Sequence, residues 1–225
     1  MVKSALGQSF ERFKVTYVDA MTTLVVRARR RASVAGMDAL DLADYRAAVA
    51  RIYLTATDLT DFRKRRDDLF AKHPQSPVER DKFTGISYYP PTDEFVAEVP
   101  LRPAAGTIDT GGPDGVVHYD RVGILETPWG ELSLWWMATY GGGLFLPVRD
   151  STCGTETYGG GRYLTDTVKG THGRGVQPLD DNRVRVDFNY LYNPSCAYDD
   201  QWLCPLAPPE NRVAAPIRAG ELKYH

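Results

Sequence analysis

Residues 141–164 read GGGLFLPVRDSTCGTETYGGGRYL, and this stretch decides the fold, because its two glycine triplets separate short apolar runs. Glycine lets the backbone adopt positive φ and approach other groups closely, which a strand in a hydrophobic core does not need. The stretch therefore indicates tight turns between strands, with a functional site beside them. The polar side chains that it brings together are Asp150, Glu156, Tyr158, Arg162 and Tyr163.

Apolar and polar residues alternate with a period of two on both sides of this stretch, which is typical of strands with one buried face. We predict strands over residues 95–101, 116–126, 132–138, 144–148 and 183–192, and loops over 103–115 and 169–182. Residues 193–209 are rich in proline and are expected to wrap the core, and residues 217–222 are a candidate for a last short strand. This pattern predicts a mainly β (α+β) fold, an antiparallel β-sandwich or a partly closed barrel.

Two helices are predicted before the strands. Apolar residues recur at three- and four-residue spacing from Leu40 to about Ala56, and a second helix begins at Thr60 or Asp61 and ends before Pro74. The charged run 63–68 in the second helix is interpreted as a solvated helix face, with a nucleic-acid patch as the alternative. The predicted organisation is a helical arm over 37–74 and a β domain over 75–225.

The first 36 residues differ from the rest in charge. They hold seven Lys and Arg against two acidic residues, whereas the whole chain has a formal net charge of -2. This asymmetry marks residues 1–36 as a separate basic extension. We interpret it as a disordered tail or as an upstream misassignment of the start codon at Met37, although an Arg-rich start also resembles an organellar transit peptide.

Composition excludes several classes of function. The chain lacks a concentrated basic surface for nucleic acid and an apolar run that could span a membrane, so a cytoplasmic location is expected. Three cysteines do not make a disulfide scaffold, and Cys196 and Cys204 are expected to be reduced, with local pairing on oxidation as the alternative. The four histidines are scattered, and the glycines match neither phosphate-binding signature. We therefore expect no metal and no cofactor.

Two polar patterns could form a site. In an extended TETYGGGRY segment, Glu156 and Tyr158 share a face and the glycines present Arg162, which would give an anion clamp or an acid–base set. The alternative is a structural Glu156–Arg162 ion pair with Tyr158 in the core. On the strand over 183–193, Asp187 and Asn189 belong to a polar face that lies either in solvent or in a wet pocket.

Together these residues resemble the bacterial family catalogued as domain of unknown function 1684 (DUF1684). The resemblance covers roughly residues 60–222 and rests on three blocks. The first comprises Asp150, Thr152, Gly154, Glu156, Thr157, Tyr158, Gly159, Gly161, Arg162 and Tyr163. The second comprises Asp187, Asn189, Tyr192, Asn193, Pro194, Cys196, Cys204, Pro205, Pro208, Pro209 and Asn211, and the third Ala219, Gly220 and Glu221. Because the family has no settled activity, the resemblance implies no catalytic residue.

We expect the DSTCGTETYGGGRY and DFNYLYNPSC segments to lie side by side and to face a common pocket. The first hypothesis is binding of a small polar or anionic molecule. The second is a hydrolase or lyase that uses Glu156 or Asp187 as general base, and the third is a structural module without a ligand. The sequence leaves the ligand, the reaction and the oligomeric state open. The predicted ligand-binding residues are Asp150, Thr152, Tyr158, Arg162, Tyr163, Asn189 and Asn193.

Overall fold

The computed structural model describes residues 36–112 and 115–225. Residues 43–225 form one compact unit, which contains all the strands found in the described ranges. The predictions for residues 1–36 lie outside the described residues, apart from Gly36, which is the first residue of helix α2. Neither α-helix in the described ranges is long and apolar enough to cross a membrane.

The two predicted helices are confirmed as α2 (Gly36–Thr55) and α3 (Leu59–Lys72). Helix α3 begins one residue earlier than expected, because the carboxylate of Asp58 caps it by accepting a hydrogen bond from the first-turn amide of Asp61 at 2.8 Å. Its buried face carries Phe62, Arg66 and Phe70, which are spaced four residues apart. The interpretation of the run 63–68 as a solvated face is therefore wrong for Arg66.

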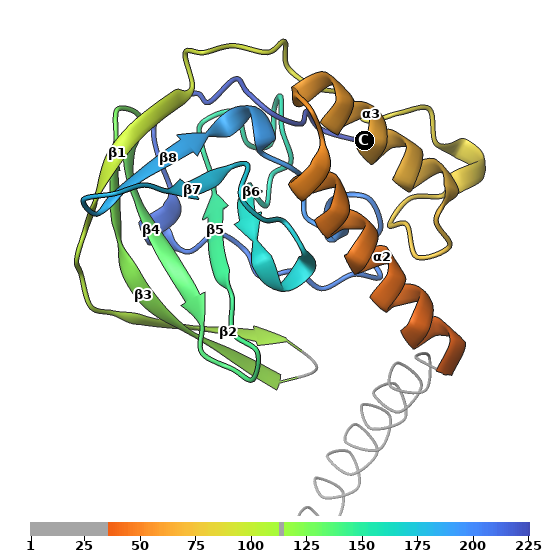
Figure 1. Ribbon diagram of the computed structural model, residues 1–225, viewed down its shortest axis with the longest axis horizontal. Coiled ribbons are helices and arrows are strands. Elements are labelled where there is room, and N and C mark those ends of the chain that lie inside the picture. The colour runs from red at the N-terminus through yellow and green to blue at the C-terminus, as the bar shows by residue number, and fades with distance from the viewer. Residues whose placement is uncertain (1–35, 113–114) are drawn as a thin grey trace, which may run out of the picture. The chain divides into compact units, whose positions relative to one another are not determined.

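The body is one antiparallel sheet in the order β6-β5-β4-β3-β1-β8-β7, with β2 paired to β3, and it curls into a nearly closed barrel (Figure 1). The predicted barrel alternative is thus confirmed. The strands are β1 (Val96–Arg102), β2 (Thr107–Gly112), β3 (Gly115–Thr127), β4 (Gly130–Met137), β5 (Leu144–Val148), β6 (Arg162–Asp166), β7 (Val176–Pro178) and β8 (Arg183–Asp187).

The end strands β6 and β7 approach each other where the barrel closes (Figure 1). The amide of Asp187 donates to the carbonyl of Gly175 at 3.0 Å, which holds the start of β7 on β8. A Cβ atom at Gly175 would collide with the carbonyl oxygen of Leu164 in β6. Closure at this point therefore requires glycine for close backbone approach.

The barrel interior is filled by aliphatic residues and Phe188, and a second cluster of aromatic residues lies beside it. Leu125, Leu146, Leu164 and Val186 have no exposed surface. The second cluster comprises Tyr119, Trp135, Phe145, Tyr163 and Tyr192, with Cys204 packed against it.

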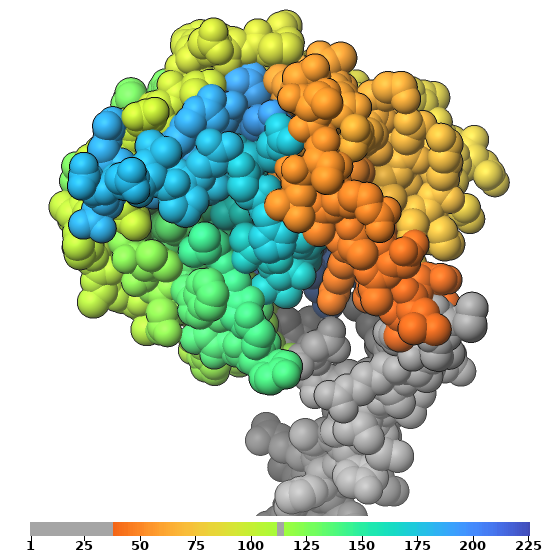
Figure 2. Space-filling model, in the orientation of Figure 1, coloured from red at the N-terminus to blue at the C-terminus, as the bar shows by residue number. Residues whose placement is uncertain are grey.

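Residues 43–72 cover one side of the barrel, where the loop before β7 meets α2 (Figure 2). The guanidinium of Arg174 donates to the carbonyl oxygens of Tyr53, at 2.7 Å, and of Ala56. Gly170 lies tightly against the same helix, because a Cβ atom there would lie 2.8 Å from the carbonyl oxygen of Arg46. The helical part is thus bound to the barrel by backbone contacts as well as by apolar packing.

Some predicted boundaries were wrong. The expected loops over 103–115 and 169–182 contain β2 and β7, and β6 follows the second glycine triplet directly. The strand expected over 183–192 ends at Asp187, because its carboxylate accepts the amide of Asn189 at 3.1 Å and starts the 3₁₀ turn Phe188–Tyr190. Residues 217–222 form an isolated bridge between Tyr88 and Glu221 in place of a strand.

Candidate functional site

The two motif segments lie side by side at Tyr163 and Tyr192. The amide of Tyr163 donates to the carbonyl of Tyr192 at 2.8 Å, and the amide of Tyr192 donates back at 3.0 Å. This antiparallel bridge places the end of the glycine-hinged segment next to the start of the NPSC loop. Most of the polar residues of the two segments nevertheless belong to three networks.

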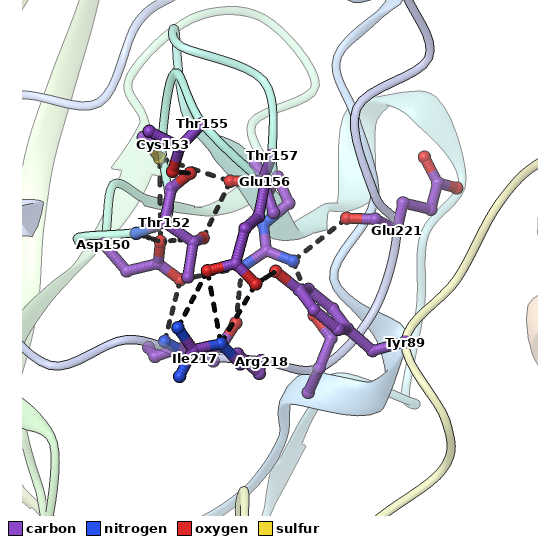
Figure 3. A network of polar contacts seen from close by, with 12 residues as sticks. Tyr89, Asp150, Thr152, Cys153, Thr155, Glu156, Thr157, Ile217, Arg218 and Glu221 are labelled. Carbon is purple, nitrogen blue, oxygen red and sulfur yellow. Dashed lines mark hydrogen bonds and ion pairs between the residues drawn. The ribbon is translucent and has the colours of Figure 1, made fainter.

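The first network is a buried ion pair between Asp150 and Arg162, and Figure 3 shows Asp150 with Thr152 and Thr157 beside it. The guanidinium of Arg162 is 1% exposed and lies 2.7 Å from the Asp150 carboxylate. It also donates to the carbonyl oxygens of Ile217 at 2.8 Å, Ala219 at 2.5 Å and Glu221 at 3.1 Å. Arg162 therefore fastens residues 217–221 to the barrel.

The threonines of the motif complete this network from the other side of Asp150. Its carboxylate accepts the amide of Thr152 at 2.9 Å and the hydroxyl of Thr152 at 2.5 Å. The hydroxyls of Thr152 and Thr157 lie 2.9 Å apart, and both residues are buried. Gly161 has φ +93 and leaves no room for a Cβ atom against the carbonyl of Val148, so the turn before Arg162 requires glycine.

The second network is a surface ion pair formed by Glu156. Its carboxylate accepts two hydrogen bonds from Nε of Arg218, at 3.0 and 3.2 Å, one from Nη2 of Arg218 at 2.8 Å, and one from the Tyr89 hydroxyl at 3.0 Å. The Arg218 guanidinium lowers the pKa of Glu156 below its ordinary value. The expected alternative of a Glu156–Arg162 ion pair is therefore wrong, because each residue has a different partner.

The third network holds the turn after β8. The carboxylate of Asp187 accepts the amide of Asn189 and also its side-chain nitrogen, at 3.1 and 2.9 Å. The same side chain of Asn189 bonds both backbone groups of Thr92, at 2.7 and 3.1 Å. Asp187 and Asn189 thus face inward and connect this turn to the segment that leads into β1.

The remaining predicted residues, Tyr158, Tyr163 and Asn193, lie near the Tyr163–Tyr192 bridge and outside the three networks. The hydroxyl of Tyr158 donates to Sγ of Cys196 at 3.6 Å, and burial raises the pKa of Tyr158 to about 12. The hydroxyl of Tyr163 donates to the carbonyl of Pro205. Of the predicted ligand-binding residues, Tyr163 and Asn193 line a cavity.

This cavity has a volume of about 50 Å³ and lies between the helices and the bridged segments. Two of its lining residues are cationic, Arg66 and Lys169, and no acidic side chain of the described residues lines it. The lining comprises Tyr45, Val49, Arg66, Phe70, Pro77, Tyr163, Lys169, Thr171, Tyr192, Asn193, Pro194, Ser195 and Tyr198.

Arg66 is the central group of the cavity. It is 5% exposed, and its Nε donates to the carboxylate of Glu221 at 2.7 Å. The guanidinium carbon also lies 4.7 Å from the ring centre of Phe70 and 5.2 Å from that of Tyr192. Burial acts to lower the pKa of Arg66, but the charge of Glu221 outweighs it and keeps the guanidinium protonated.

Glu221 occupies the inner side of Arg66 and is fully buried. Its carboxylate also accepts the amide of Asn193 at 2.7 Å and the hydroxyl of Tyr198. In Figure 3 this carboxylate points away from the Arg162 network. The Arg66–Glu221 pair is therefore a second buried ion pair, distinct from that of Asp150 and Arg162.

Asn193 contributes an unpartnered acceptor to the cavity. Its side-chain nitrogen donates to the carbonyl of Leu222 at 2.8 Å, which fixes the orientation of the amide. The side-chain oxygen is buried and has no hydrogen-bond partner. The hydroxyls of Thr171 and Tyr192 lie 3.4 Å apart, and burial raises the pKa of Tyr192 well above its ordinary value. The cavity thus offers neutral hydroxyls, one amide oxygen and a guanidinium.

Sequence reasoning missed the residues that give the cavity its charge, Arg66 and Lys169, and the buried partner Glu221. A signal for Arg66 existed, because it falls midway between Phe62 and Phe70 on one helix face. Glu221 lies in the last block of the DUF1684-like pattern. Within the described residues, no group of three or more His, Cys, Asp or Glu side chains could hold a metal ion.

The fold and the cavity define a mainly antiparallel, nearly closed β-barrel protein with a small cavity under its helices. The chain belongs to the family described as "Protein of unknown function (DUF1684)", which matches residues 81–222. A similar solved structure is the solution NMR structure of an uncharacterized protein of Haloarcula marismortui. It shares 32% sequence identity and a TM-score of 0.50, over 73% of this chain and 91% of that chain. The comparison with curated proteins gave no match.

Proposed function

We propose that this DUF1684 protein binds a small oxyanion, such as a carboxylate or an inorganic anion, in the cavity lined by Arg66. The observation that carries the proposal is the buried guanidinium of Arg66, which pairs with Glu221 through Nε and lines a cavity that has no acidic side chain of the described residues in its lining. Charge-assisted hydrogen bonds to a carboxylate or phosphate are the strongest that an arginine makes. A buried arginine that lines a cavity favours such a ligand.

The size of the cavity limits the ligand. A cavity of about 150 Å³ holds benzene, so one of about 50 Å³ accommodates only a few non-hydrogen atoms. The hydroxyl of Tyr192 can donate to an oxyanion oxygen, because burial keeps it protonated by raising its pKa, whereas the hydroxyl of Tyr198 already donates to Glu221. The side-chain oxygen of Asn193 needs a donor, which a protonated oxyanion or a bound water supplies. These features together favour a small ligand with both acceptor and donor atoms.

An enzymatic role is the alternative. A general base at neutral pH usually needs a raised pKa, whereas Arg218 lowers that of Glu156. Asp187 is hydrogen-bonded within its own turn. Because neither carboxylate lines the cavity, the geometry favours binding over catalysis. The three free cysteines support a cytoplasmic location for this activity.

The proposal is tested by thermal unfolding of the full chain in phosphate, acetate or bicarbonate, with chloride at matched ionic strength as reference. An anion at 100 times its Kd stabilises the native state by about 2.7 kcal/mol, which raises Tm by roughly 5 to 10 °C for a protein of this size. We expect at least one of these anions to raise Tm above the chloride reference.

Matched variants decide whether Arg66 holds the anion. Arg66→Lys keeps the charge beside Glu221 but removes the planar fork, so the anion-dependent shift in Tm should disappear. Arg65→Lys makes the same change one position away, where the side chain pairs with Asp61 at the surface, and should respond as the wild type does. If Arg66→Lys does not fold, Lys169→Gln at the cavity edge should reduce the shift. An equal shift in all variants contradicts the proposal, and no shift in any anion favours a structural module.

A further inference from the structure

Cys196 and Cys204 lie together on the loop that follows the Tyr163–Tyr192 bridge. Cys196 belongs to the 3₁₀ turn Ser195–Ala197, and its backbone amide donates to Sγ of Cys204 at 3.4 Å. Both cysteines are free and half-buried. This hydrogen bond brings the Cys204 sulfur next to the backbone of Cys196. The fold therefore places a dithiol at a position that a small molecule can reach.

The surroundings of the pair make the two sulfurs chemically different. Hydrogen bonding from the Cys196 thiol, assisted by the charge of Lys169, lowers the pKa of Cys204 below that of an ordinary thiol. The same interaction raises the pKa of Cys196 and outweighs the Tyr158 hydroxyl, which donates to the Cys196 sulfur at 3.6 Å and acts to lower that pKa. The thiolate is the nucleophilic form, and the backbone amide of Cys196, which donates to Sγ of Cys204 at 3.4 Å, favours it at Cys204. Cys204 is therefore the attacking group and Cys196 the resolving group.

Cys153 provides an internal comparison. It is also half-buried, but burial raises the pKa of its thiol, and its sulfur lies 3.8 Å from the carboxylate of Asp150. A carboxylate next to a sulfur opposes thiolate formation. Cys153 should therefore react slowly with the reagents that modify Cys204.

We propose that Cys196 and Cys204 form a redox-active dithiol that is oxidised by low-molecular-weight disulfides. The Cys204 thiolate attacks one sulfur of the disulfide RSSR, which forms a Cys204–SR mixed disulfide and releases RS⁻. Cys196 then loses its proton to solvent and attacks the Cys204 sulfur, which releases a second RS⁻. In sum, the protein dithiol is oxidised by two electrons and RSSR is reduced to two thiols.

The proposal is independent of the anion cavity, although the sites are neighbours. Ser195 lines the cavity beside Cys196, and Pro205, next to Cys204, accepts the hydroxyl of Tyr163. A Cys196–Cys204 disulfide would join the two ends of the segment 196–204 at the edge of the cavity. Binding of an anion and oxidation of the dithiol can be measured separately, because Arg66→Lys changes the first and the cysteine variants change the second, whereas Lys169 lines the cavity and also acts on Cys204.

The test uses the full chain incubated with oxidised glutathione at neutral pH, then quenched with N-ethylmaleimide and examined by intact-protein mass spectrometry. The wild type should lose two hydrogens, carry no glutathione and retain a single alkylatable cysteine, Cys153. Cys196→Ser should accumulate a glutathione adduct on Cys204, because the resolving thiol is absent. Cys204→Ser should react with oxidised glutathione at least about tenfold more slowly than the wild type, because it lacks the thiolate.

Cys153→Ser is the matched control and should form the disulfide as the wild type does. Circular dichroism of each variant before oxidation confirms that the chain is folded. Three results would overturn the proposal: no disulfide in folded wild-type protein, a glutathione adduct on Cys153 at the rate of Cys204, or no adduct in folded Cys196→Ser. Disulfide formation with hydrogen peroxide but not with glutathione disulfide would also overturn it, because the oxidant would be of another class.

Discussion

Replacing Arg162 by methionine tests whether the glycine-hinged motif is part of the architecture. The change keeps most of the side-chain volume but leaves the carboxylate of Asp150 buried without its cation, and three carbonyls of residues 217–221 lose a charged donor. Removing one partner of a buried ion pair costs about 3 to 5 kcal/mol. The orphaned carbonyls add to this, although not additively. We expect a loss of at least about 4 kcal/mol, a large part of the 5 to 15 kcal/mol typical of native proteins.

The assay is urea unfolding followed by tryptophan fluorescence. Trp135 is fully buried, and its indole nitrogen donates to the side chain of Asn211 at 2.8 Å, so unfolding changes its surroundings. With an m-value of about 2 kcal/mol/M, the expected loss lowers the midpoint by about 2 M. Arg162→Lys keeps the charge with fewer donors and should give an intermediate midpoint, which is the measurable variant if Arg162→Met does not fold.

Arg218→Met is the matched control for this experiment. It removes the same groups from an exposed ion pair with Glu156, where both side chains remain in contact with water. Its unfolding midpoint should lie close to that of the wild type. The reasoning is refuted if Arg162→Met and Arg218→Met have midpoints within about 0.5 M of each other, which is within the spread of ordinary surface substitutions.

Three further predictions follow from single contacts. Gly175→Ala should cost about 1 to 3 kcal/mol in urea unfolding, because its Cβ atom collides with backbone at the barrel closure, whereas Gly111→Ala, where the space is open, should be nearly neutral. Asp58→Ala should cost about 0.5 to 2 kcal/mol in the same assay, because it removes the N-cap of α3, and helicity measured by circular dichroism should fall. In iodoacetamide labelling followed by peptide mass spectrometry, Cys204 should become reactive at a lower pH than Cys153. Cys204 should react first because Cys196 and Lys169 lower its pKa, whereas burial raises the pKa of Cys153. The nearby hydroxyls of Tyr158 and Tyr163 stay neutral, because burial raises the pKa of each. The reverse order would contradict it.

The strands that the sequence predicted well are those whose pattern is local. Strands β3, β4 and β5 alternate clearly or lie between Gly and Pro turns, and their bounds agree with the structure to within two residues. Strands β2 and β7 were missed because they are short and rich in Thr, Gly and Pro. Their register comes from a neighbour, as when Ile108 pairs with Tyr119 across the β2–β3 ladder. The alternation of polar and apolar residues within one segment does not reveal which other strand that segment pairs with.

The candidate site was harder to predict, for a physical reason. A segment rich in polar side chains and glycine indicates buried hydrogen bonds, but these can hold either a ligand or the chain itself. Asp150 and Arg162 bond to each other and to the backbone, so their buried charges are already paired. Arg66 was missed for a different reason. It lies in a run of charged residues, which predicts a solvated helix face, although its own side chain belongs to the buried face of α3.

Residues 217–222 link these two buried charges, because Arg162 holds their carbonyls while the side chain of Glu221 holds Arg66. An anion at Arg66 would share the guanidinium with Glu221, so the rise in Tm would measure the new contact less the repulsion between the anion and the Glu221 carboxylate. The two arginines therefore give opposite expectations. Arg162→Met lowers stability but leaves the rise in Tm caused by the anion, in whatever fraction remains folded, whereas Arg66→Lys removes that rise. If Arg162→Met also abolishes the anion response in folded protein, then the binding site extends into the Asp150 network, and Arg162 has more than a structural role.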